Sequence, residues 1–153
     1  MGKSLSLNPI GLIRRSGGFR LEVDEAYRPA LRSLELFSHA IVLWWADQHD
    51  NPDSRAIMQT ELPYAPGVTA GVFACRSEYR PNPIATTVCQ IEDVDQAAGV
   101  VRLRNIDAHD GSPLLDIKPY IGVVDRVAKV ETADWFSGWP EWLPEEGLGL
   151  EGD

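Results

Sequence analysis

The stretch Asp-Gly-Ser-Pro-Leu-Leu-Asp-Ile-Lys-Pro-Tyr-Ile at residues 110–121 decides the fold class, because it joins a tight turn directly to an extended segment. Its first four residues are strong turn-formers and predict a turn. The rest, from Leu115 to Ile121, predicts a strand, on which Asp116, Lys118 and Tyr120 share one face at period two. Such a row of acid, cation and phenol is either a ligand-facing row or a salt-bridged surface face.

Turn-forming Gly, Pro or Asn residues interrupt the whole chain about every ten residues, and the segments between them are short. One short helix is predicted at 28–36, where Pro29 fits the first turn and two leucines share a face. The segment 47–59 is predicted to be a loop. Short strands without a long helical period are typical of an all-β fold, here a small closed β-barrel with short helices. The other strands are predicted at 9–14, 38–46, 67–75, 84–91 and 100–106.

Length and composition describe an ordinary globular protein of one domain. The chain has 153 residues, 44% of them hydrophobic and 24% charged, which is enough to bury a core without disulfides or metals. Cys75 and Cys89 lie in apolar stretches and are predicted to be buried thiols, so no disulfide framework and no zinc site is expected. The longest apolar run, 40–46, is too short to span a bilayer and no leader pattern opens the chain, so we expect a cytoplasmic protein and no membrane partner.

The net charge of -9 is concentrated in the last residues. Residues 131–153 hold seven of the 23 acids and none of the 14 bases, so residues 1–130 are nearly neutral. We therefore expect a barrel domain at 1–130 and an acidic, Trp-rich tail at 131–153. Three tryptophans within 135–142 predict that this tail packs on the barrel or on a second subunit, and they predict a homodimer. Charge alone neither supports nor excludes RNA as a partner.

Two further segments carry more charge or more turn-formers than a barrel needs. In residues 71–84, Arg76 and Arg80 lie beside the rigid turn Pro81-Asn82-Pro83, an arrangement that suits a carboxylate or phosphate ligand. A plain surface turn with two solvated arginines is the alternative. His39 follows Phe-Ser at the start of the apolar run, and it is either a hydrogen-bonded structural histidine or a base.

Three blocks together resemble the signature segments of the TsaA-like (TrmO-type) family of S-adenosylmethionine-dependent tRNA methyltransferases. They are Phe-Ser-His at 37–39, the segment 71–84 with Arg-Pro-Asn-Pro-Ile, and the block 110–121, and their order and spacing agree over roughly residues 8–126. The resemblance implies a small β-barrel rather than a Rossmann fold, which agrees with the absence of a Gly-rich strand-turn-helix motif. It also implies methyl transfer to the exocyclic nitrogen of threonylcarbamoyladenosine beside the tRNA anticodon, with S-adenosyl-L-methionine as cofactor and tRNA as partner.

Carried over residue by residue, the resemblance implies cofactor contacts from three separate segments. They fall on Asp47 and Gln48, on Arg76, and on the turn formed by Asp110, Gly111, Ser112 and Pro113. Asp116, Lys118 and Tyr120 extend that turn and are the candidate catalytic residues.

In this assignment Asp116 is the first candidate for the base, Tyr120 is the second, and Lys118 orients a carbonyl. No metal is expected to take part.

The chain departs from the family pattern in its first loop and at two single positions. Residues 15–20 replace a longer loop rich in proline and glycine, Asp47 stands where many members have histidine, and Ala85 replaces the usual glycine. These departures leave two other functions open. One is a non-catalytic module that binds S-adenosylmethionine or RNA, and the other is a methyltransferase acting on another small acceptor.

Overall fold

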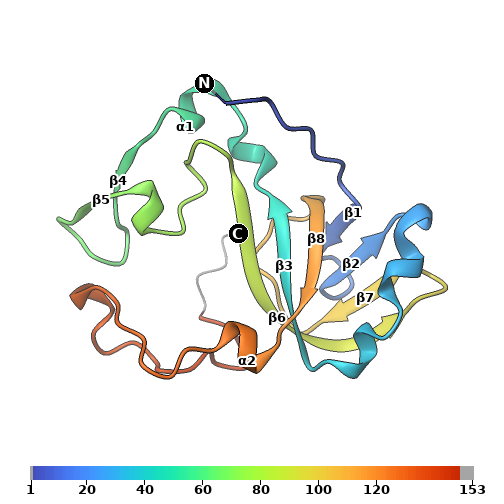
Figure 1. Ribbon diagram of the computed structural model, residues 1–153. Coiled ribbons are helices and arrows are strands. Elements are labelled where there is room, and N and C mark those ends of the chain that lie inside the picture. The colour runs from blue at the N-terminus through green and yellow to red at the C-terminus, as the bar shows by residue number, and fades with distance from the viewer. Residues whose placement is uncertain (1, 149–153) are drawn as a thin grey trace.

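The computed structural model describes residues 2–148, and its main body is a sheet of six antiparallel strands (Figure 1). The strands hydrogen-bond in the order β1-β2-β7-β6-β3-β8, and β1 pairs with both β2 and β8, so the sheet closes on itself as a barrel. The mainly-β class expected from the sequence is confirmed. The strands are β1 Gly11–Arg14, β2 Arg20–Val23, β3 His39–Trp45, β6 Ile84–Asp95, β7 Val100–Leu103 and β8 Pro113–Pro119.

The chain between β3 and β6 leaves the barrel and forms a separate two-stranded sheet, which lies to one side of the six strands in Figure 1. Its strands are β4 Gln59–Glu61 and β5 Thr69–Gly71. All helices are short. The α-helices are α1 Pro52–Arg55 and α2 Gly122–Asp125, and the 3-10 helices are η1 Glu25–Leu31, η2 Leu34–Leu36, η3 Asp47–His49, η4 Val72–Ala74 and η5 Asp134–Phe136.

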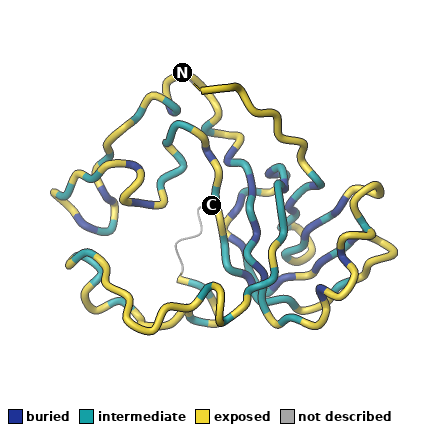
Figure 2. Tube along the Cα trace, in the orientation of Figure 1, coloured by how far each residue is buried: buried dark blue, intermediate teal, exposed yellow. Residues whose placement is uncertain are grey.

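The core lies inside the barrel and follows the two-residue alternation of the strands (Figure 2). In β3, Ala40, Val42 and Trp44 are buried while the residues between them are half-buried on the outer face. The Trp44 indole N–H donates to the Thr87 hydroxyl over 3.2 Å, and that hydroxyl bonds Asp107 in turn. The indole N–H, the one polar group of the Trp44 side chain, therefore has a hydrogen-bond partner. Burying the ring leaves no donor unpaired.

The predicted strand at 67–75 is largely wrong. Only residues 69–71 are extended, and the 3-10 helix η4 follows them. Val72 and Cys75 are buried three residues apart while Phe73 is 81% exposed, so the apolar residues follow a helical turn rather than a strand.

The segments at 28–36, 20–23 and 113–119 also differ in detail from the prediction. The predicted helix at 28–36 is two 3-10 helices, separated by Ser33, whose φ of 75° is left-handed. Leu31 and Leu34 are nevertheless both buried, as their spacing predicts. Strand β2 was not predicted, because four residues between two turns give too short an alternation to recognise. Strand β8 begins two residues earlier than predicted.

The acidic tail is placed by an aromatic cluster and by the contacts of Arg104 with Glu145 and Glu146. Tyr64, Phe136 and Trp139 form the cluster, with ring centroids 5.1–5.5 Å apart, and Trp135 packs on the same excursion from the barrel. Nearer the end of the tail, Glu146 pairs with Arg104, which follows β7. Residues 149–153 of the predicted tail lie outside the described residues.

Closure of the barrel requires glycine at position 11. A Cβ on Gly11 would lie 1.9 Å from the carbonyl oxygen of Glu22 on the paired strand. We expect Gly11→Ala to lower the free energy of unfolding by about 1–3 kcal/mol, the cost of overpacking. Urea unfolding measures this. Gly71→Ala is the control, because its Cβ meets nothing nearer than the Met58 oxygen at 3.9 Å. Equal losses in both variants would contradict the explanation.

Candidate functional site

The predicted site segments meet at one end of the barrel. Trp44 of β3 lies opposite Ala85 of β6 on one side and Leu114 of β8 on the other. The end of β3 therefore adjoins the start of both neighbours. Asp47 and Gln48 follow β3 directly, in η3, and both are exposed. The 47–48 turn, the beginning of β6 and the 110–113 turn are thus neighbours, although they are up to 66 residues apart in the chain.

Arg76 is tied to the outer face of the sheet. Its Nη1 donates to the Thr86 hydroxyl over 3.1 Å. Thr86 lies directly opposite Leu43 on β3, and Asp116 lies opposite Leu43 from the other side. Because adjacent strands are about 4.8 Å apart, the backbones at Thr86 and Asp116 are about 10 Å apart on the same outer face. The structure therefore brings Arg76 and Asp116 to two sides of one surface.

The 110–113 turn uses its side chains for its own structure. The Asp110 carboxylate accepts the backbone N–H of Arg15 over 2.7 Å, and the buried Ser112 hydroxyl donates to the His109 carbonyl over 2.8 Å. Gly111 has a φ of 82°, and its N–H bonds the Ile13 carbonyl over 2.7 Å. The turn is consequently fixed to β1, and the half-exposed Asp110 carboxylate also lies 3.8 Å from the Arg14 guanidinium.

Asp116 and Lys118 lie on the outer face of β8, as the period-two pattern predicts, and they form an ion pair of 2.9 Å. The other Asp116 oxygen accepts the Ile117 N–H over 2.9 Å. Tyr120 follows β8, and its N–H bonds the His39 carbonyl. The His39 ring bonds the neighbouring Ser38 hydroxyl over 2.7 Å. The structure thus contains the salt-bridged face that the sequence left open, and it leaves the Asp116 carboxylate half-exposed.

A cavity of about 680 Å³ opens at the end of the barrel where the predicted segments meet. Of the predicted cofactor residues, Pro113 alone lines it. Its wall on the barrel side is Trp45, Arg55, Asn82, Ile84, Pro113 and Leu115, and the N-terminal segment contributes Lys3, Ser4, Leu5, Leu7 and Pro9.

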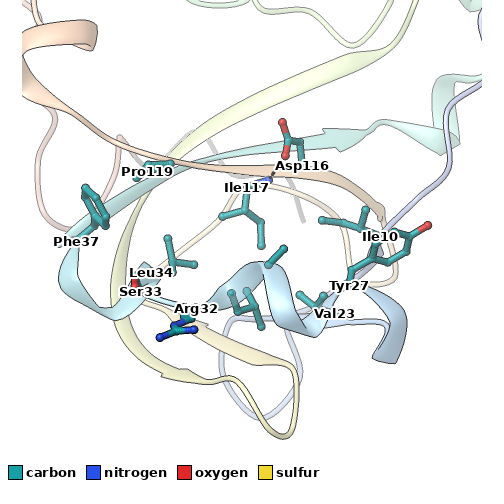
Figure 3. A pocket seen from close by; sticks show the side chains of 12 residues that line it. Ile10, Val23, Tyr27, Arg32, Ser33, Leu34, Phe37, Asp116, Ile117 and Pro119 are labelled. Carbon is teal, nitrogen blue, oxygen red and sulfur yellow. Dashed lines mark hydrogen bonds between the residues drawn. The ribbon is translucent and has the colours of Figure 1, made fainter.

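A smaller cavity, of about 280 Å³, lies between η1, η2 and the barrel (Figure 3). It is mainly apolar, and Asp116 is its one acidic lining residue. Figure 3 shows the Asp116 carboxylate directed away from this cavity, while the Ile117 side chain points into it. The carboxylate therefore belongs to the outer face rather than to this cavity.

Arg55 and its partners were missed by the sequence reasoning. The Arg55 guanidinium bonds the Pro81 carbonyl, Asp50 and Asn82, and it lies over the Trp45 ring. Hydrogen bonds from Trp45 and then from Arg55 lower the pKa of the Asp50 carboxyl below its ordinary value. A loop of ordinary polar residues gives no sequence signal for such a network.

Between residues 2 and 148, no cluster of three or more His, Cys, Asp or Glu side chains is arranged to hold a metal ion. No helix in the same part of the chain is long and apolar enough to cross a membrane. Burial raises the pKa of the Cys89 thiol far above its ordinary value, so this thiol stays protonated inside the core.

Residues 10–126 match the family model of the tRNA-methyltransferase O N-terminal domain. An S-adenosyl-L-methionine-binding protein of Archaeoglobus fulgidus is 34% identical over 82% of this chain and 96% of its own length. The tRNA (adenine(37)-N6)-methyltransferase of Mus musculus is 40% identical over 63% of this chain but only 21% of its own.

The crystal structure of TrmO from Pseudomonas aeruginosa superposes with a TM-score of 0.68 at 29% identity, over 86% of this chain and 63% of that one. The chain thus spans under two thirds of the solved structure and about a fifth of the mouse enzyme. Since the family model covers the whole barrel, the chain belongs to the family of the tRNA-methyltransferase O N-terminal domain.

Proposed function

We propose that this protein is an S-adenosylmethionine-dependent methyltransferase that modifies tRNA at the exocyclic nitrogen of threonylcarbamoyladenosine beside the anticodon. Family membership carries the proposal, and the relatives' names supply the cofactor and the kind of acceptor. The convergence of three separate segments beside one large cavity supports a ligand site at that end of the barrel. The threonylcarbamoyl group is the finer part of the proposal and rests on the family resemblance.

We place the cofactor at the end of the barrel, against Asp47, Gln48, Arg76 and the 110–113 turn. The Arg76 guanidinium is exposed and uses Nη1 on Thr86. Its remaining donors suit the carboxylate of the methionine moiety, which a planar guanidinium binds through paired hydrogen bonds. The backbone of the 110–113 turn and the adjoining cavity give the rest of the ligand a concave surface.

Arg76→Ala should weaken S-adenosylmethionine binding by about 1.5–3 kcal/mol, the range for a hydrogen bond to a charged group. Isothermal titration calorimetry measures the affinity. Arg102→Ala is the matched control, because Arg102 is an exposed arginine on β7, opposite Asp93 at the far end of β6 from Thr86. No binding by the wild type, or equal affinities of wild type and Arg76→Ala, would contradict the proposed cofactor site.

For the reaction, we assign the base to Asp116. Bound S-adenosylmethionine would supply the methyl group, which the acceptor nitrogen would take by in-line displacement of the thioether. A ureido-type nitrogen reacts once its proton leaves, and a half-exposed carboxylate is suited to accept it. Lys118, paired with Asp116 at 2.9 Å, is placed to orient a carbonyl of the acceptor. Tyr120 is the second candidate for the base, and alignment of nucleophile and methyl also lowers the barrier.

Asp116→Asn should bind the cofactor and fold normally but transfer methyl about a hundredfold more slowly, or worse, the usual contribution of a general base. Single-turnover transfer and thermal melts on one preparation separate this from a structural role. If Asp116 only pairs with Lys118, the variant melts earlier and the folded fraction keeps its turnover. Asp93→Asn, an exposed acid on β6, is the control for charge loss alone.

A second function has one observation in its favour. The Archaeoglobus relative, whose length this chain nearly matches, bears a name that states only S-adenosyl-L-methionine binding. A non-catalytic module that binds this cofactor or RNA, or a methyltransferase for another small acceptor, therefore stands as the alternative. Mass spectrometry of tRNA nucleosides from cells with and without the protein decides between them, because only the tRNA enzyme changes a methylated nucleoside.

We also propose that the protein is a homodimer. Val123 and Val124 are 93% and 72% exposed, and Trp142 is 66% exposed, so apolar surface remains uncovered in one chain. Closed two-fold pairing is the commonest way to bury such surface. Light scattering at micromolar concentration should give twice the chain mass, and a monomer mass would contradict the proposal. The boundary between domain and tail at residue 130 stays a prediction.

A further inference from the structure

We propose that Arg55 is a positioning residue for cofactor binding, whose guanidinium holds the turn carrying Asp47 and Gln48 to the loop carrying Arg76. The inference rests on the proposed function, because it assigns a role within the proposed cofactor site. Arg55 contacts no reacting atom in this assignment. It acts by fixing the distance between two segments that must bind one ligand together.

Three hydrogen bonds from Arg55 join the two segments. Its Nε donates to the Pro81 carbonyl over 2.7 Å, and its Nη2 donates to the Asn82 side-chain oxygen over 3.0 Å. Its Nη1 donates to Asp50 over 2.9 Å, at the end of the turn that begins with Asp47. Because the donors of a guanidinium are fixed in one plane, these bonds set both the distance and the orientation of the segments.

Trp45 anchors this unit to the barrel. The second oxygen of Asp50 accepts the Trp45 indole N–H over 3.1 Å, and the Arg55 guanidinium lies 5.9 Å from the Trp45 ring centroid. Trp45 is the last residue of β3 and pairs with Ile84 at the start of β6. The guanidinium therefore connects both loops to the strand ends from which they emerge.

A second bridge joins the same two segments. His49 Nε2 lies 2.8 Å from a Glu78 oxygen, and the His49 ring packs edge-on against Tyr79 at 4.6 Å. Glu78 is two residues from Arg76, so this bridge contacts the loop near Arg76, whereas Arg55 contacts the same loop near Asn82. Two bridges between segments about 30 residues apart favour one pre-organised unit over two independent loops.

Helix α1 carries Arg55 as its last residue and supports it. It is four residues long, its one buried residue is Ser54, and the Asn51 side chain caps it by accepting the Ser54 N–H over 2.8 Å. The Arg55 side chain is 38% exposed and lies outside the barrel core. Its loss should therefore affect the two loops far more than the folding of the barrel.

The test is Arg55→Lys in the full chain, with S-adenosylmethionine affinity measured by calorimetry and folding by thermal melts. The three donors of an ammonium share one nitrogen and cannot reach three acceptors spread around a guanidinium, so we expect about a tenfold or greater rise in Kd. The melting temperature should stay close to that of the wild type. In Arg55→Ala, added guanidinium at sub-denaturing concentration should restore part of the affinity, and methylammonium should not.

Arg28→Lys is the matched control. Arg28 also joins two carbonyls, those of Val23 and Ala97, but at the opposite end of the barrel, and its replacement should leave Kd within about twofold. If Arg55→Lys does not fold, Asp50→Ala removes one of the three acceptors and should raise Kd in the same direction.

The outcomes separate the two proposals. Failure of the wild type to bind S-adenosylmethionine overturns the proposed function. Wild-type binding with an unchanged Kd in folded Arg55→Lys, or an equal loss in Arg28→Lys, overturns the role of Arg55 alone.

Discussion

Strand β3 is hydrogen-bonded along both edges, and the positions of the other site elements depend on that pairing. All seven of its residues pair with β6, and five of them also pair with β8. Its alternate residues Ala40, Val42 and Trp44 fill the barrel, so a slip of one residue would turn them outward. Burial of these residues therefore fixes the register of β3. The same register places Leu43 between Thr86 of β6 and Asp116 of β8.

An irregularity in β8 allows Leu114 to face the core and Asp116 to face outward. Leu43 lies opposite Asp116, but the next residue, Trp44, lies opposite Leu114, so Leu115 is an extra residue in the ladder. In a regular strand Leu114 and Asp116 would share one face. The extra residue lets Leu114 point into the core while Asp116 stays outside. A bulge thus places the candidate base on the surface where Arg76 is tied.

The sequence predicted features that produce a local pattern of residues, and it missed features that depend on contacts between distant segments. Strand β7 alternates clearly, and Asp116 and Lys118 were placed on one face by the same period of two, whereas β3 is apolar on both faces and was predicted from its β-branched and aromatic residues. The excursion at 67–75 has apolar residues but no partner strand beyond β4, so apolarity alone misled the prediction. Arg55 was invisible because two of its three acceptors, Pro81 and Asn82, lie in a distant turn, and one of these is a backbone carbonyl.

The 110–113 turn shows that the residues of a family motif can also be required by the local backbone structure. The family resemblance implies cofactor contacts at Asp110 and Ser112, and in the structure their side chains also bond the Arg15 N–H and the His109 carbonyl. Gly111 supplies a left-handed φ and carries no Cβ. These residue types are thus required by the turn itself, before any ligand is considered. In the proposed site the turn lies beside the cavity, and the Asp110 side chain is half-exposed, with its second carboxylate oxygen 3.8 Å from Arg14 and open to a ligand.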